Sequence, residues 1–94
     1  MSEGKKYDDG KPPLDLLPTP FLAGAARAMA FGADKYGREN YLGLENGERR
    51  YVAAALRHVL AFRDGSTCDN ESGLDHLAHA AACIAILMHR RDNQ

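Results

Sequence analysis

The feature that most constrains the fold is an alanine-rich segment, residues 71–89, in which apolar side chains recur every three to four positions. These apolar positions are Leu74, Leu77, Ala78, Ala81, Ile84, Ala85 and Met88. A repeat of this period places apolar side chains on one side of an α-helix. We therefore expect a helix from about Glu71 to His89 that is buried on one side.

Two further segments have the same helical character. The first spans residues 20–36 and is followed by Gly37, with Thr19 expected as its N-cap and proline in the first helical position. The second spans about residues 48–64 and is apolar nearly all round, which is typical of a helix that lies between others. No stretch alternates in polarity as a strand would. The sequence therefore predicts an all-α fold, a small bundle of three to four helices.

The chain of 94 residues is expected to form one domain, residues 1–94, with an extended N-terminal arm at residues 1–18 that is rich in lysine, aspartate, glycine and proline. A chain of this size buries only about 60 to 65% of its unfolded surface, so a monomer would be marginally stable. We therefore expect a homo-oligomer, a dimer or tetramer, in which a partner chain completes the bundle.

Composition argues against several classes of protein. Twelve basic and 13 acidic residues leave a net charge of −1, which gives no electrostatic reason to expect a nucleic-acid polymer or a membrane as partner. No apolar run approaches the roughly 18 residues of a membrane span, and no signal peptide is evident. Cys68 and Cys83 indicate neither a disulfide framework nor a zinc site. These features predict a cytoplasmic protein.

Polar residues interrupt the third helical segment at helical spacing. If the helix begins near Glu71, then Glu71, Asp75 and His79 share one ridge, with His76 one step round. Carboxylate oxygens suit Mg²⁺ or Mn²⁺, whereas imidazoles are better bases or hydrogen-bond donors for such a site. The alternative interpretation is that the acids favour the helix dipole and that the histidines are ordinary surface residues.

The second segment carries Arg57 and His58 within an otherwise apolar run. A buried arginine or histidine needs a partner, and the polar ridge of the third helix is one candidate. Alternatively, Arg57 pairs with Asp64 or extends to water. Glu45 and Glu48 form another acid pair at the start of this helix, for which a capping role is the alternative to metal binding.

Basic residues near the N-terminus and after the first helix form a third group. Lys11, Lys35 and Arg38, with Asn40 as a neutral donor, could contact a polyphosphate. The chain has no glycine-rich phosphate loop of the Walker type. The alternative is that these side chains are merely solvated.

Four motifs together resemble a known family. They are KYDDGKPPLDLLP, FGADKYGRENY, LRHVLAF and ESGLDHLAHAA, and they resemble the phage dATP/dGTP diphosphohydrolase domain, called MazZ in some members and related to the MazG-like all-α nucleoside triphosphate pyrophosphohydrolases. The resemblance covers about residues 6–87. It implies a helical, usually oligomeric enzyme that uses Mg²⁺ or Mn²⁺ to convert dATP or dGTP to the monophosphate and pyrophosphate, in the host cytoplasm if the protein is phage-encoded.

The resemblance also implies site residues. The matching positions are Lys11, Lys35, Tyr36, Asn40, Arg57, His58, Glu71, Ser72, His76 and His79. The wider superfamily holds its metals with a Glu-x-x-Glu and a Glu-x-x-Asp pair, whereas here Glu71 is followed by Asp75 four positions later. This departure leaves four alternatives for part of the metal binding or its support: His58, Asp69, His76 and His79.

The resulting hypothesis is metal-assisted hydrolysis at the α-phosphorus. Its metal ligands are Glu71 and Asp75 with Glu48. Its catalytic bases are His58 and His79, and its substrate-binding residues are Lys11, Lys35, Tyr36, Asn40, Arg57 and His76. Two alternatives remain: a phosphohydrolase of the HD type, for which the chain has only the reversed doublet Asp75-His76, and a catalytically silent helical homo-oligomer.

Overall fold

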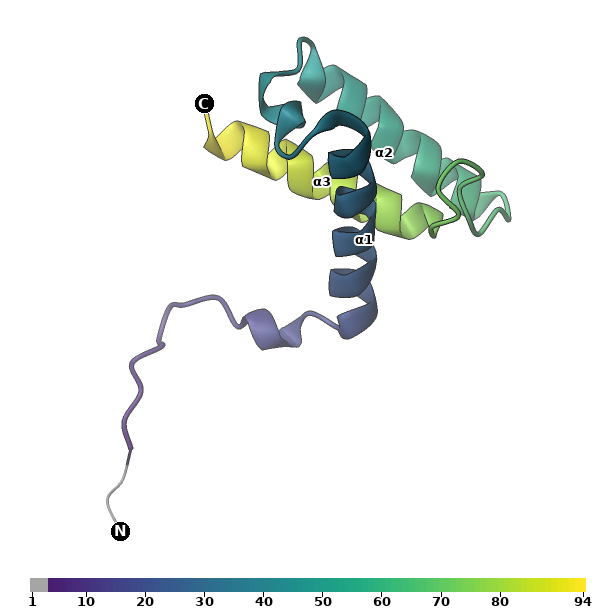
Figure 1. The fold of residues 1–94 in the computed structure, drawn as a ribbon. Coiled ribbons are helices and arrows are strands. Elements are labelled where there is room, and N and C mark those ends of the chain that lie inside the picture. The colour runs from purple at the N-terminus through teal and green to yellow at the C-terminus, as the bar shows by residue number, and fades with distance from the viewer. Residues whose placement is uncertain (1–3) are drawn as a thin grey trace.

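The computed structural model describes residues 4–94, so the first three residues of the predicted arm lie outside the described part. These described residues contain three α-helices and two short 3-10 turns (Figure 1). In chain order these are η1 (Leu14–Leu16), α1 (Thr19–Tyr36), η2 (Asn40–Gly43), α2 (Gly47–Arg63) and α3 (His76–Asp92). Residues 4–94 contain one isolated bridge and no named strand. The prediction of an all-α fold is therefore confirmed.

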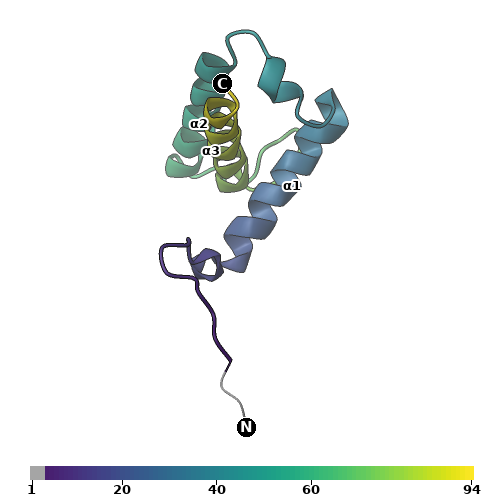
Figure 2. The same cartoon turned by 90° about the vertical axis from the view of Figure 1, so that its left-hand side faces the viewer.

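Helix α3 is the centre of the fold because both other helices pack against it. Helices α2 and α3 lie side by side and run in opposite directions, while α1 crosses them steeply (Figures 1 and 2). The buried residues of α3 are mostly small: His76, Ala78, Ala80, Ala82, Cys83 and Ile86. A Cβ built on Gly24 of α1 would lie 3.2 Å from the Cβ of Ala78. Small residues thus let α1 and α3 approach closely.

The core of the single chain is thin. No side chain among residues 4–94 is less than 2% exposed. Helix α2 packs on α3 and η2, and it leaves large apolar side chains in solvent, namely Val52, Leu56, Val59, Leu60 and Phe62. The expectation that α2 lies between other helices is therefore wrong for the single chain, because only one of its sides is covered.

The start of α3 also differs from the prediction. The helix begins at His76 and not at Glu71. Gly73 has a φ of 74°, in the left-handed region, and Asp75 has an extended backbone, so neither continues a helix towards the N-terminus. At α1 the N-cap is Pro18, so the expected cap Thr19 is already a helical residue.

The described part of the N-terminal arm, residues 4–18, extends away from the three helices (Figure 1). It contains η1 as its only regular element. Within residues 4–94, no helix is long and apolar enough to cross a membrane.

Candidate functional site

A loop between α2 and α3, residues 64–75, folds back on itself and places an aspartate beside the start of α3. The Asp69 N–H donates to the Leu74 carbonyl at 2.8 Å, and the Gly73 N–H donates to the Asp69 carbonyl at 2.8 Å. The His76 N–H donates to the Thr67 carbonyl at 2.9 Å. These backbone hydrogen bonds fix the position of Asp69 relative to the first residue of α3.

Three histidines meet next to this loop. His58 comes from the C-terminal half of α2, and His76 and His79 come from the first turn of α3. The Nδ1 atoms of His58 and His76 are 2.9 Å apart. The ring of His79 stacks on that of His58, with centroids 4.7 Å apart and 13° between the planes. His76 is 8% exposed, so it is a buried polar residue that has its partners close by.

Two serines bind the outer sides of these rings. Ser66 Oγ is 3.0 Å from Nε2 of His76, and Ser72 Oγ is 2.6 Å from Nε2 of His79. Ser72 Oγ also accepts a hydrogen bond from the Leu74 N–H at 3.0 Å. The serines therefore hold the orientation of two of the three imidazoles.

Asp69 completes the group and could hold a cation together with two of the histidines. One ligand atom each from His58, Asp69 and His76 lies within 4.8 Å of the others. Asp69 Oδ2 accepts hydrogen bonds from the backbone N–H groups of Ser72 at 2.9 Å and Glu71 at 3.1 Å. The Ser72 N–H holds the pKa of Asp69 below its usual range, so this carboxylate is charged at neutral pH.

His58, in contrast to the charged Asp69, is favoured in its uncharged form because it is partly buried. Loss of solvent lowers the pKa of His58, and neighbouring charge on His79 and His76 would lower it further. The uncharged imidazole is therefore the favoured form at neutral pH. A neutral imidazole has a free nitrogen lone pair, which can accept a proton or bind a metal ion.

Helix α1 borders the cluster through two residues one turn apart. The ring of Phe31 meets His79 edge-to-face, with centroids 6.0 Å apart. Lys35 Nζ lies 2.8 Å from Glu71 Oε2, and this hydrogen-bonded pairing raises the pKa of Lys35. Lys35 Nζ is also 5.3 Å from the centroid of the Tyr36 ring. Lys35 therefore links the loop that carries Asp69 with the residues at the end of α1.

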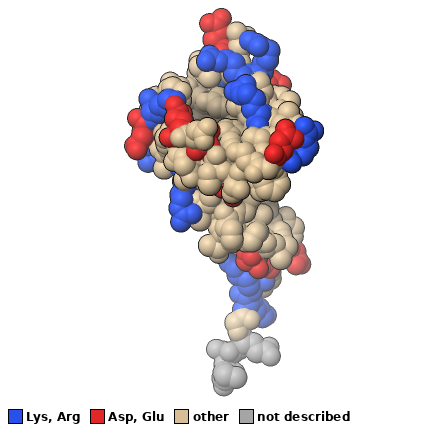
Figure 3. All heavy atoms as spheres, turned by 90° about the vertical axis from the view of Figure 1, so that its right-hand side faces the viewer, with Lys and Arg blue, Asp and Glu red and all other residues tan. Residues whose placement is uncertain are grey.

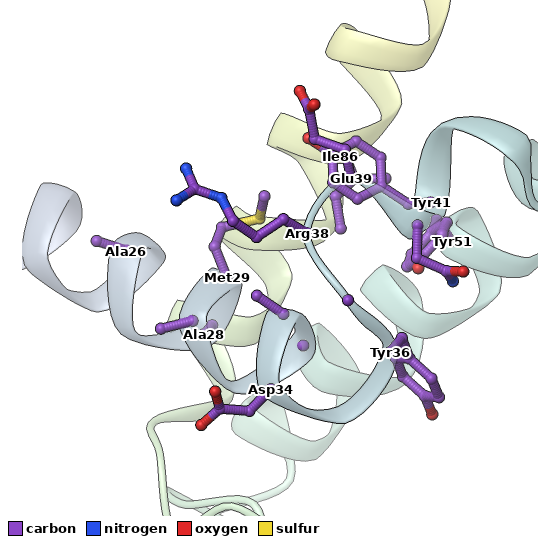
Figure 4. A pocket seen from close by; sticks show the side chains of 15 residues that line it. Ala26, Ala28, Met29, Asp34, Tyr36, Arg38, Glu39, Tyr41, Tyr51 and Ile86 are labelled. Carbon is purple, nitrogen blue, oxygen red and sulfur yellow. The ribbon is translucent and has the colours of Figure 1, made fainter.

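A cavity of about 630 Å³ opens on another side of α1, between its C-terminal half, the following loop and α3 (Figure 4). Its polar and aromatic lining includes Tyr36, Arg38, Asn40, Tyr41 and Tyr51. A volume of this order is typical of small-molecule sites. The cavity and the histidine cluster are thus separated by α1 and connected by the adjacent residues Lys35 and Tyr36.

Charge is spread in small groups over the face that Figure 3 shows. Lysines and arginines lie near aspartates and glutamates at the upper end and along the arm, with mostly uncharged surface between them. This face of the described chain carries no extended patch of one sign. The two close ion pairs of residues 4–94, Lys35–Glu71 and Arg63–Asp64, are both exposed.

The structure does not form the expected ridge of acids along α3. Glu71 precedes the helix and pairs with Lys35, while Asp75 is the N-cap and accepts from the Leu77 N–H at 2.8 Å. Glu48 lies in the first turn of α2, ten residues before His58, and is thus roughly 15 Å along the helix axis from the cluster. The prediction that these acids share one site is therefore wrong for the single chain. Their role as metal ligands stays a prediction.

Other predicted residues have mixed placements. Of the Arg57-His58 pair, His58 meets the α3 histidines as expected, whereas Arg57 is exposed and Asp64 pairs with Arg63 instead. Lys11 is exposed and belongs to the arm, which extends away from the three helices. The N-cap of α2 is Asn46, and no side chain caps that helix. The capping alternative for the Glu45 and Glu48 pair is therefore not seen.

Sequence reasoning missed two residues of the site, Ser66 and Phe31. A serine in a polar loop and a phenylalanine on a helix carry no distinctive pattern of their own. The usable signal for Ser66 is its place three residues after α2 ends, near the buried His76. Phe31 lies four residues before Lys35, on the same face of α1.

Comparison with known proteins gives two matches. A family model described as dATP/dGTP diphosphohydrolase, N-terminal, matches residues 1–94. A protein of Salmonella phage PMBT28 named dATP/dGTP diphosphohydrolase is 40% identical over 91 residues, covering 97% of this chain and 31% of the phage protein. The chain thus spans about a third of the length of this curated relative. No solved structure matches the chain.

Proposed function

Because the chain belongs to the family of dATP/dGTP diphosphohydrolase N-terminal domains, we propose that it hydrolyses dATP and dGTP to the monophosphate and pyrophosphate with the help of Mg²⁺ or Mn²⁺. The observation that carries this proposal is the convergence of His58, Asp69, His76 and His79 on one side of α1, with a cavity of nucleotide size on another side of that helix. We further propose that the reaction takes place in the cytoplasm, that of the host if the protein is phage-encoded.

The cavity beside α1 is the proposed site of the purine and the deoxyribose. Its volume of about 630 Å³ is sufficient for a nucleoside. The rings of Tyr36, Tyr41 and Tyr51 offer aromatic surface for the base, and Asn40 and Arg38 offer hydrogen-bond donors. A preference for purines would depend on these residues.

Lys35 is the proposed phosphate-binding residue. It lies between the cavity and the cluster, and its charge is balanced by Glu71 at 2.8 Å. Both partners of this ion pair are substantially exposed, so a phosphate could displace Glu71 at little cost. Glu71 would then be released to accept hydrogen bonds or a cation near the phosphates.

The cluster supplies the groups that hydrolysis requires. A bound divalent ion would neutralise charge on the phosphates and favour deprotonation of water. His58 or His79 is the proposed base that orients the water and accepts its proton, and Ser72 holds the ring of His79 in place. Phosphoryl transfer needs little covalent chemistry from the protein, so these positioned side chains are adequate for the reaction.

The remaining predicted residues are not part of the cluster in the single chain, so a role for them in the site requires a second copy of the chain. Lys11 and Arg57 are exposed in the single chain, and Glu48 is remote from the cluster. The uncovered apolar face of α2, formed by Val52, Leu56, Val59 and Leu60, is proposed to bury itself against a second copy. Sedimentation analysis should give a dimer or tetramer that Leu56→Glu dissociates and Arg50→Glu, exposed on another side of α2, does not, and a monomer at all concentrations would contradict this.

The activity is tested by incubating the 94-residue chain with dATP, dGTP and their ribonucleotide counterparts. Each reaction contains Mg²⁺, Mn²⁺ or a chelator, and the products are separated by ion-exchange chromatography. We expect metal-dependent release of pyrophosphate that is lost in His79→Gln and kept in His89→Gln. Failure to turn over any nucleotide would favour the alternative, a catalytically silent helical homo-oligomer.

A further inference from the structure

We propose that His58, Asp69 and His76 form a binding site for one transition-metal ion such as Mn²⁺, Co²⁺ or Zn²⁺, in preference to Mg²⁺. The inference deepens the proposed function, because it names the ion-binding residues of the same site. It also differs from the expected all-carboxylate site, whose acids the single chain does not bring together.

The spacing of the three side chains fits a single ion. Adjacent ligand atoms that are about 2.1 Å from one ion lie roughly 3 Å apart at right angles. The Nδ1 atoms of His58 and His76 are already 2.9 Å apart. The ligand atoms of the trio all lie within 4.8 Å of one another, close to the roughly 4 Å that opposite ligands of one ion span. The three side chains can therefore reach one ion with little rearrangement.

The hydrogen bonds around the trio suit metal binding. Histidines that bind metals usually donate their other ring N–H to an oxygen, and Ser66 Oγ is placed to accept from Nε2 of His76 at 3.0 Å. In that tautomer Nδ1 of His76 carries a free lone pair directed at His58. Asp69 is likewise held by the two backbone N–H groups on its Oδ2.

The chemical nature of the ligands decides which ion is preferred. Imidazole nitrogen binds Zn²⁺, Co²⁺ and Mn²⁺ readily, whereas Mg²⁺ prefers oxygen ligands and keeps its water. Three protein ligands also leave positions open for water or phosphate oxygens. His79 stacks on His58 outside the trio, so it stays free to act as the base.

The experiment titrates the purified chain with CoCl₂ in the absence of nucleotide, and it follows the visible absorption of Co²⁺ and the binding heat. We expect one equivalent to bind with absorption bands of mixed nitrogen and oxygen ligation. His58→Gln and Asp69→Asn should each raise the Kd by about 100-fold or more. His89→Gln, roughly 20 Å away along α3, should bind as the wild type does.

Three results would overturn the inference: no saturable Co²⁺ binding, equal binding by Asp69→Asn when it is folded, or Mg²⁺ binding as tightly as Mn²⁺. If the variants do not fold, Mn²⁺ added to the wild type gives the answer. It should broaden the histidine ring NMR signals of His58 and His76 at much lower Mn²⁺ concentrations than that of His89, and uniform broadening would contradict the site. Since nucleotide is absent from both measurements, a chain that hydrolyses dGTP with Mg²⁺ yet binds no Co²⁺ would refute this inference alone.

Discussion

The two ends of α3 both carry histidines, but they place them in different surroundings. At the N-terminal end, His76 is buried and has His58, Ser66 and Asp69 around it. At the C-terminal end, His89 is exposed, and its Nδ1 lies 2.8 Å from the Tyr41 hydroxyl. The same residue type is therefore part of a convergent polar cluster at one end and of a single surface contact at the other.

The neighbouring side chains explain why only the N-terminal end of α3 is suited to binding an ion or a substrate. The N-terminal cluster consists of side chains with lone pairs that an ion or a substrate can recruit. At the C-terminal end, the Arg90 guanidinium hydrogen-bonds the Tyr41 carbonyl and lies directly over Gly47, where any Cβ would collide with it. Arg90 on α3 therefore ties η2 and the start of α2 to that helix.

The largest expected effect comes from exchanging histidine for glutamine at each end. His76→Gln should lower the rate of dGTP hydrolysis by about 100-fold or more, because it removes a group from the centre of the cluster. His89→Gln should leave the rate within about twofold, since a surface substitution away from the site has little effect. Steady-state kinetics with circular dichroism on both variants checks this, and equal losses would erase the distinction between the two ends.

The packing that supports the N-terminal end can be tested at the contact of α1 with α3. Gly24→Val should lower the free energy of unfolding by about 1 to 3 kcal/mol, because its side chain would overlap Ala78. Gly32→Val is the matched control on the same helix, since nothing lies within 4 Å of a Cβ there. Urea denaturation measures both, and equal stability would mean that α1 does not approach α3 closely.

The structural tie at the C-terminal end should be worth less. Arg90→Met keeps the aliphatic stem but removes the hydrogen bond to the Tyr41 carbonyl, and we expect a loss of about 1 kcal/mol. Arg91→Met, on the exposed side, should change stability by less than about 0.5 kcal/mol. Thermal melts of the two variants give the comparison. A loss of Co²⁺ binding in folded Arg90→Met would show that the two ends are not independent.

The smallest expected effect on stability is at Lys35. Lys35→Met should leave the melting temperature unchanged, because its ion pair with Glu71 is exposed. It should nevertheless raise the KM for dGTP several-fold if Lys35 binds phosphate. Arg27→Met, also exposed on α1, is the control. An unchanged KM in Lys35→Met would remove Lys35 from the substrate site.

Much of the fold could be predicted from local pattern. The apolar period and the glycines place α1 and α2 within one or two residues of their observed bounds. The start of α3 could not be placed in this way, because Glu71 and Ser72 are acceptable residues for a first helical turn. The observed start at His76 depends on the left-handed backbone of Gly73 and on backbone hydrogen bonds within the preceding loop. The spacing of apolar residues reveals neither.

The candidate site was predictable in its residue types but not in its arrangement. His58, His76 and His79 stand out because histidines are unusual in apolar helical segments, and Asp69 stands among the alternatives that the family motif leaves open. Their meeting point depends on how α2 and α3 pack and on where the intervening loop turns. A helical ridge of Glu71 and Asp75 requires both residues to be helical, whereas α3 begins only at His76.

The sequence by itself determined the helical class, the three main helices, the family and the residue types available for chemistry, because these depend on local periodicity and on motifs along the chain. Only the tertiary structure decided that Asp69 joins two histidines, that Glu71 pairs with Lys35, and that Ser66 and Phe31 border the site. The physical reason is that these contacts join different elements of the chain, and their distances follow from packing between helices and from one loop's backbone hydrogen bonds.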